Sequence, residues 1–282
     1  MQTFAQEAGS SVYRDPNSRR REPQINTGVL TGLTENDKQV QFIESSILMN
    51  VPADSYIAVF GLVQEGPLPA ASNATVNRHL AAFIKSIDAL GIRQDDVFAD
   101  FISQNRVFDY TESANTITEK LSGFETKKNI AVRYKDAKLL EKILTAAEQA
   151  TIFDLIEVDY VVSDAKAVRV RLFEEAVKVI KQKEASYNSS FGLNLASRAL
   201  ASEKYDVFYP GERYQAYQAF ESGKAYSAYN KTVIRPRKVT TFYYEPVKTG
   251  DFDTVINPLS VTPMVQFTLY LRMQYRLPEI KK

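Results

Sequence analysis

The stretch that decides the fold is Val261-Thr262-Pro263-Met264-Val265-Gln266-Phe267-Thr268-Leu269-Tyr270-Leu271-Arg272-Met273-Gln274, close to the end of the chain. Its odd-numbered positions are apolar, and most of its even-numbered positions are polar. Strand side chains point alternately to opposite faces, so a period of two sustained over this length indicates one strand. We therefore predict an antiparallel strand with one face buried and the other in solvent.

Working back from this strand, strand-like and helix-like patterns alternate. The predicted strands span 40–49, 56–63, 97–110, 123–134 and 152–162, and the first two are joined by a Pro52-Ala53-Asp54 turn. Three amphipathic helices are predicted, with N-caps at Asn73, Asp136 and Asp164, and the first of them stops at Gly91. This order predicts an α+β fold of antiparallel sheets with packed helices, made of two strand-helix-strand units plus a C-terminal strand.

The domain organisation follows from where the alternation of strands and helices is interrupted. Residues 1–38, with Arg19-Arg20-Arg21 and Pro23, are expected to form an N-terminal arm, either a solvated segment or a docking strand for a neighbouring subunit or an anionic surface. Residues 39–282 are expected to form the α+β domain. A Tyr-rich insertion is expected at about 199–237.

Composition excludes several classes of function. The 282 residues contain no Cys, no Trp and a single His, which rules out disulfides, thiolate sites, Cys nucleophiles and His-pair metal sites. A net charge of +1 gives no bulk electrostatic argument for nucleic acid. No run of 18 apolar residues is present, so we expect no transmembrane helix. The N-terminus lacks a signal-peptide pattern, so we expect either a cytosolic protein or a form whose signal has been removed.

The search for catalytic residues nominates none, and no cofactor or metal site is predicted. His79 falls at the edge of a helical apolar stripe, and nucleophile-elbow, phosphate-loop and dinucleotide motifs are absent. Asp95-Asp96 is typical of a turn, and Glu174-Glu175 of a solvated helix face. In a regular strand, Asp154 would not share a face with Glu157 or Asp159. An unrecognised hydrolase using Asp154, Glu157, Asp159, Glu174 and Glu175 is the third-ranked hypothesis.

The most unusual positive feature is a concentration of aromatic residues interleaved with Lys and Arg. The candidate subunit-interface residues are Tyr205, Tyr209, Tyr214, Tyr217, Phe220, Tyr226 and Tyr229. Tyr and Arg are enriched at protein interfaces, although the same composition also suits packing within the chain. Stacking of nucleic acid or a glycan is a third alternative, which nearby acidic residues disfavour.

Several local strings resemble the SIMPL-domain family (DUF541) of bacterial envelope proteins, which includes an oxidative-stress defence protein. The strings are Pro52-Ala53-Asp54-Ser55-Tyr56-Ile57-Ala58-Val59, Ala89-Leu90-Gly91-Ile92 followed by Gln94-Asp95-Asp96-Val97, Gly123-Phe124-Glu125-Thr126-Lys127-Lys128-Asn129-Ile130-Ala131-Val132, and Leu172-Phe173-Glu174-Glu175-Ala176. With the final strand, the resemblance covers about 40–197 and 238–277. It departs from the family in Ala53, in the arm and in the long 199–237 segment.

The resemblance implies an α+β fold, location in the periplasm or at the cell surface of a Gram-negative bacterium, no cofactor, and a homo-oligomer that is ring-like in at least one member. It transfers no catalytic residues. Our first hypothesis is therefore a non-enzymatic envelope protein, linked to stress defence, that self-assembles into a ring-like or cage-like homo-oligomer through the arm and the Tyr-rich segment. The alternative is a module that captures a small ligand, glycan or peptide through the Tyr-rich segment.

Overall fold

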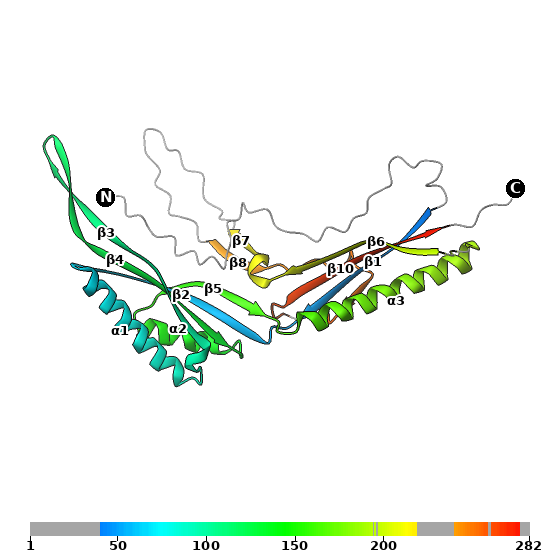
Figure 1. Ribbon diagram of the computed structural model, residues 1–282, viewed down its shortest axis with the longest axis horizontal. Helices are drawn as coiled ribbons and strands as arrows, with labels where there is room; N and C mark the ends of the chain where they lie inside the picture. Colours follow the sequence, from blue (N-terminus) through cyan, green and yellow to red (C-terminus); the bar gives the residue numbers. More distant parts are fainter. Residues whose placement is uncertain (1–39, 194, 196, 219–239, 259–260, 277–282) are drawn as a thin grey trace, which may run out of the picture. The chain divides into compact units, whose positions relative to one another are not determined.

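The computed structural model describes residues 40–193, 195, 197–218, 240–258 and 261–276, drawn in colour in Figure 1. The described chain divides into two compact units. Unit 1 is the continuous segment Ala53–Ser163, and unit 2 combines 40–52 with the described residues from Asp164 onwards. The predicted N-terminal arm at 1–38 lies outside the described residues.

Unit 1 is an antiparallel sheet with two helices on one face (Figure 1). Its strands run in the order β3-β4-β2-β5, with β2 at Ser55–Gly66, β3 at Val97–Ser113, β4 at Thr116–Tyr134 and β5 at Asp154–Val161. The helices are α1, Pro69–Asp88, and α2, Leu139–Gln149, and the short helix η2, Gln94–Asp96, precedes β3. The core between sheet and helices includes Phe60 of β2, Phe83 of α1 and Ile143 of α2.

Unit 2 is a second sheet, packed against one long helix. Its strands run in the order β6-β10-β1-β9, with β6 at Ser197–Phe208, β10 at Val265–Arg276, β1 at Val40–Val51 and β9 at Thr254–Ile256. The helix α3, Ala165–Phe191, contacts β1 and β10. The short helix η3, Pro210–Arg213, precedes a small separate hairpin of β7, Tyr214–Gln218, and β8, Thr240–Tyr244. The predicted α+β class is thus confirmed.

Four local predictions differ from the structure. Asp136 is not the N-cap of the second helix, because its Oδ1 accepts the Lys138 N–H at 3.0 Å in a turn and the helix follows with Lys138 at the N-cap. The first helix begins at Pro69 rather than after Asn73, because proline at the first helical position has the required φ and lacks only an N–H that would be unpaired there. The strands on either side of Pro52-Ala53-Asp54 belong to different sheets rather than to one hairpin. Residues 199–208, which we assign to the insertion, lie in β6 and pair with β10. By contrast, the Asp164 cap is confirmed, because its Oδ1 accepts the Ala167 N–H at 2.9 Å.

The alternating strand β10 is antiparallel as predicted, but it is buried on both faces. The odd-numbered side chains face α3, and the Tyr275 hydroxyl lies 3.3 Å from the Glu184 carboxylate of that helix. The even-numbered Gln266 and Thr268 are also buried. The Gln266 amide oxygen accepts the Val247 N–H at 2.7 Å, and its Nε2 donates to Asn50 Oδ1 at 2.8 Å. The predicted half-buried strand is therefore wrong, because the second face carries an internal hydrogen-bond network.

Asp54 joins the two ends of unit 1. Its backbone N–H donates to the Val161 carbonyl at 2.9 Å, and its carboxylate accepts the backbone N–H and the hydroxyl of Ser163, both at 2.7 Å. These two hydrogen bonds from Ser163 favour the charged carboxylate, so they lower the pKa of Asp54 below its ordinary value. The folded state consequently binds a proton at Asp54 less readily than the unfolded state does.

We expect Asp54→Asn to lower the urea midpoint of unfolding at pH 7. The stabilisation by the carboxylate is present above the pKa of the unfolded state and is lost as the pH falls through the lower pKa of the folded state. The difference between wild type and variant should therefore shrink below about pH 4. Urea titrations followed by circular dichroism at pH 7 and pH 3 measure this, and an equal difference at both pH values would contradict the prediction.

Candidate functional site

The structure does not gather the predicted Tyr-rich interface into one described patch. Tyr205 lies in β6, where its ring centroid is 6.3 Å from that of Phe267 and the Arg169 guanidinium lies 5.2 Å from the ring. Tyr214 packs against Tyr244 within the β7–β8 hairpin, with ring centroids 5.8 Å apart. Tyr209 and Tyr217 are exposed, whereas Phe220, Tyr226 and Tyr229 lie outside the described residues. A subunit contact at these residues stays a prediction.

The carboxylates of β5 lie together, contrary to the regular-strand expectation. The register of β5 against β2 shifts at Ile156, so Asp154, Glu157 and Asp159 oppose Gly61, Val59 and Ile57, respectively. Opposed residues share a face, and the bulge therefore places all three acids on the face away from the helices. All three are exposed at a sheet edge, and no group of metal-binding residues is found in the described part of the chain.

Glu174 and Glu175 lie on α3, as expected for a solvated helix face. Glu175 pairs with Lys178 at 3.1 Å, and both side chains are partly exposed. Glu174 lines a shallow depression together with Val177, Lys178, Lys181, Gln182 and Ala185. This depression takes in one of the five candidate carboxylates and no aromatic ring, so it supports neither the hydrolase nor the aromatic binding module.

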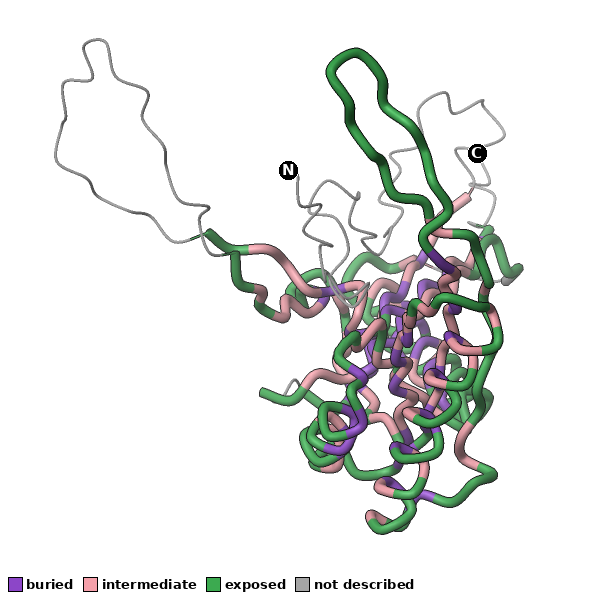
Figure 2. Tube along the Cα trace, turned by 90° about the vertical axis from the view of Figure 1, so that its left-hand side faces the viewer, coloured by how far each residue is buried: buried purple, intermediate pink, exposed green. Residues whose placement is uncertain are grey.

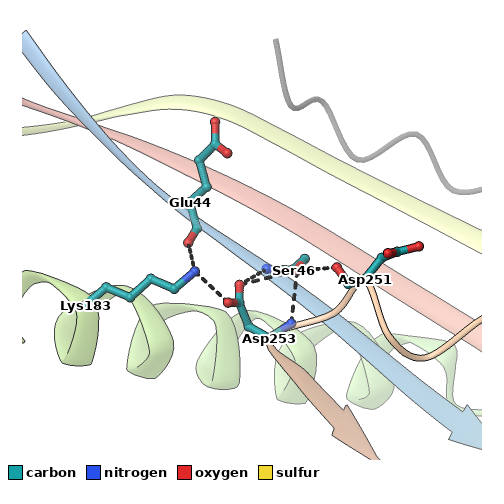
Figure 3. A network of polar contacts seen from close by, with 5 residues as sticks. All are labelled: Glu44, Ser46, Lys183, Asp251 and Asp253. Carbon is teal, nitrogen blue, oxygen red and sulfur yellow. Dashed lines mark hydrogen bonds and ion pairs between the residues drawn. The ribbon is translucent and has the colours of Figure 1, made fainter. Parts of the chain in front are cut away.

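The described part of unit 2 contains a cluster whose residue types resemble catalytic ones, shown in Figure 3. Lys183 Nζ lies 2.6 Å from Asp253 Oδ1 and 2.8 Å from the Glu44 carbonyl oxygen. Asp253 Oδ2 accepts the Ser46 N–H at 2.9 Å, and the Ser46 hydroxyl lies within 3.3 Å of Asp253 Oδ2 and of the Asp251 carbonyl oxygen. These contacts tie β1, α3 and the chain before β9 together. The cluster therefore explains how the β9 edge is held in place.

The outer half of the β3–β4 hairpin is not needed for the packing of unit 1. The β2–β4 ladder ends where Gly66 opposes Phe124. Beyond that point Pro67 has no N–H to continue a ladder, and Pro69 begins α1. Gly66 fits there because a Cβ would lie 2.8 Å from the Ser72 nitrogen. The two remaining strand segments continue alone, and we call residues 107–123 the ribbon.

The ribbon extends well beyond the rest of unit 1 in Figure 1, and in Figure 2 it is the tall, almost wholly exposed loop. Its strands are rich in β-branched and aromatic residues, which accounts for strand formation. No third strand pairs with the ribbon among the residues that the structure describes. Isolated two-stranded hairpins are marginally stable in water, so a ribbon of this length gains from a further contact.

The ribbon has one apolar face and one polar face, and a bulge sets this division. Val107 opposes Gly123 but Phe108 opposes Leu121, so Ser122 is the extra residue, and its hydroxyl donates to the Val107 carbonyl at 3.1 Å. The shift places Leu121 on the same face as Phe108. What we call the apolar face carries Phe108, Tyr110, Ile117 and Leu121, which are 42%, 71%, 70% and 45% exposed, respectively. Glu112 and Glu119 also lie on this face, and the Tyr110 hydroxyl donates to the Glu119 carboxylate at 3.3 Å. The opposite face carries Asp109, Thr111, Thr118 and Lys120.

This apolar face is the candidate functional site that sequence reasoning missed. The 97–110 strand was predicted, but its Phe108 resembles a core residue in sequence, and the return strand was predicted to begin only at Gly123. The signal that could have found the ribbon is a pair of short strand-like runs, each with at least two apolar residues, on either side of the polar residues Ser113–Thr116. Exposed apolar residues gathered on one face mark interaction surfaces more often than isolated ones do.

In the described part of the chain, no helix is both long enough and apolar enough to span a bilayer. The half-buried His79 lies on α1, as its place beside the apolar stripe suggested.

Comparison with known proteins gives one positive result. A comparison with curated proteins finds no match. A family model described as SIMPL, "Protein of unknown function (DUF541)", matches residues 48–241. The matched region contains all of unit 1, including the ribbon, and a large part of unit 2. Because the match covers more than half of the chain and agrees with the strings and the α+β fold described above, this protein belongs to the SIMPL (DUF541) family.

Proposed function

We propose that this protein is a non-enzymatic subunit that self-associates through the ribbon. The observation that carries the proposal is the apolar face of Phe108, Tyr110, Ile117 and Leu121, which projects beyond the sheet of unit 1. Exposing such a face costs free energy in water, and burial of one large apolar side chain contributes about 1.5–3 kcal/mol.

The net charge of the chain and the charges of the ribbon favour a second copy of the chain as the partner that covers the apolar face. The chain carries a net charge of +1, so identical subunits repel little. The ribbon itself has the acids Asp109, Glu112 and Glu119 against Lys120, and its turn at Ser113–Thr116 is polar. Such a tip suits neither an anionic bilayer surface nor insertion into lipid.

The finer points of the sequence hypothesis remain part of this proposal. They are a ring-like or cage-like assembly, a place in the bacterial envelope and a link to stress defence, all of which rest on the family resemblance. The exposed Tyr209 and Tyr217 are available for a further contact. Among the described residues, no contact or pocket supports the alternative, a module that captures a ligand through the Tyr-rich segment.

Replacing Phe108 by aspartate tests the proposal. We expect the native mass to fall to that of a smaller species, with association at least about tenfold weaker, because each interface loses a large apolar contact and gains a buried charge. Light scattering over a range of protein concentrations measures the mass.

The matched control is Thr118→Asp, which introduces the same charge at an exposed position on the polar face of the same ribbon. This variant should retain the mass of the parent protein. A parent that is monomeric at every concentration, or a Phe108→Asp variant with the parent mass, would refute self-association through the ribbon.

A further inference from the structure

The sheet of unit 1 has two edges, and they differ in how well they are protected. β5 is short, bulged at Ile156, and carries Asp154, Glu157 and Asp159 on its exposed face. Short length, bulges and charge are the features that keep an edge strand from pairing with another chain. β3 is the other edge, and it runs from Val97 to Ser113. Because β3 is about twice as long as β5, it is the less protected of the two edges.

One segment of β3 is suited to pairing with a further strand. The register against β4 shifts between Phe101 and Ser103, so Ile102 is a bulge that interrupts the edge. From Ser103 to Ser113 the residues of β3 follow one another without an extra residue, because the next irregularity, at Ser122, lies in β4. This outer edge, residues 103–113, contains Phe108 at its midpoint.

A two-fold axis at Phe108 would let the outer edge pair with the same edge of a second copy along its whole length. Antiparallel identical strands place residues at equal distances from the axis opposite each other. In this register Arg106 lies opposite the partner's Tyr110, Gln104 opposite the partner's Glu112, and Val107 opposite the partner's Asp109. No like charges meet, and a cation lies beside an aromatic ring, which is an attractive arrangement.

Registers with the axis at Arg106, Asp109 or Glu112 are disfavoured by charge, and an axis at any residue other than Phe108 shortens the segment of 103–113 that can pair. Moving the axis to Arg106 places two arginines opposite each other, and moving it to Asp109 or Glu112 does the same with two carboxylates. The outer edge of β4, residues 116–123, fares worse, because an axis at its centre opposes Glu119 with Glu119 or Lys120 with Lys120. Opposed like charges destabilise a strand pair.

We propose that two copies of this chain pair antiparallel through residues 103–113 of β3, about a two-fold axis at Phe108. This inference rests on the proposed self-association and specifies its geometry. Pairing turns two marginal two-stranded ribbons into one four-stranded sheet, and three or more strands with a hydrophobic face have independent stability. Phe108 meets the partner's Phe108, and the apolar faces of the two ribbons become continuous.

Disulfide trapping tests this geometry, because the chain contains no cysteine of its own. Asn105 and Thr111 are both exposed on the polar face, and each lies opposite the other residue of the second copy in the proposed register. Opposed Cα atoms in an antiparallel pair are about 4.5–5.5 Å apart, within the range of a disulfide. We expect the full-length double variant Asn105→Cys/Thr111→Cys to become mostly a covalent dimer under mild oxidation, with doubled mass on a non-reducing gel.

The single variants Asn105→Cys and Thr111→Cys are the controls, and they should remain monomeric on the same gel. In each of them the two cysteines of a dimer are six residues out of register, about 20 Å apart. Packing of the two apolar faces against each other would leave both positions pointing away from the contact, so it would give no covalent dimer from the double variant.

The outcomes separate the two proposals. A covalent dimer that forms from the double variant, and from neither single variant, supports the pairing. An oligomeric parent whose double variant gives no covalent dimer overturns the pairing about Phe108 and leaves the proposed function standing. A parent that is monomeric by light scattering overturns both, and equal cross-linking of single and double variants overturns the register.

Discussion

Replacing Phe60 by alanine is expected to lower the free energy of unfolding of unit 1 by about 3–5 kcal/mol. Phe60 is 1% exposed on β2, and its ring lies edge-on to Phe83 of α1, with centroids 5.5 Å apart and an interplanar angle of 69°. Alanine removes both the apolar transfer free energy and the contacts lining the cavity that remains. This ring pair joins the sheet to its larger helix, so the loss falls on the core of unit 1.

Hydrogen exchange followed by mass spectrometry can measure this effect for each unit separately. Protection of the β2 and β4 amides should fall, whereas protection of the β10 amides in unit 2 should change little. The matched control is Phe108→Ala, because Phe108 is 42% exposed on the ribbon. The control should change the stability of a monomer by no more than about 0.5 kcal/mol. Equal losses for the two variants would contradict the assignment of Phe60 to the core.

Replacing Gln266 by leucine is expected to destabilise unit 2 by about 2–6 kcal/mol. Gln266 is fully buried, and its side chain bonds both the Val247 N–H and the Asn50 carboxamide. Leucine is close to Gln266 in size but leaves a buried donor and a buried acceptor without partners, and each costs about 1–3 kcal/mol. Urea denaturation, with exchange of the β10 amides as a local probe, measures the loss.

A double-mutant cycle distinguishes the network from simple packing. Asn50 also donates through Nδ2 to the Asn257 carbonyl at 2.7 Å, so Asn50→Leu alone is destabilising. Gln266→Leu and Asn50→Leu together remove both partners of the shared hydrogen bond, so their combined cost should be less than the sum of the two single costs. Additive losses would show that the two amides act independently.

The local elements were largely predictable, because each depends on a short-range pattern. The two strands around Pro52, the helix capped by Asp164 and the terminal strand all appear close to their expected places. The buried second face of β10 was not predictable, because its polar residues are satisfied by distant groups. Gln266 bonds Asn50, 216 positions away in the sequence, and its alternation with apolar neighbours looks the same as that of a solvent-facing residue.

The ribbon escaped prediction for a related reason. Whether Phe108 is a core residue or a surface residue depends on where β2 ends, and β2 ends at Gly66 because the chain turns into α1 there. Likewise, the shared face of Asp154 and Glu157 depends on a bulge that appears only once β5 pairs with β2. Composition drew attention to the Tyr-rich segment instead, where Tyr205 and Tyr214 make contacts within the chain.

The hydrogen bonds of Asp54 to Val161 and Ser163 have a consequence for how the protein is put together. They hold the entry and the exit of the Ala53–Ser163 segment side by side. A segment whose ends meet can be taken out of a chain, or placed into another, with only a short bridge to close the gap. Unit 1, which carries the ribbon, thus has the geometry of an inserted domain. The described part of the Tyr-rich segment belongs to unit 2.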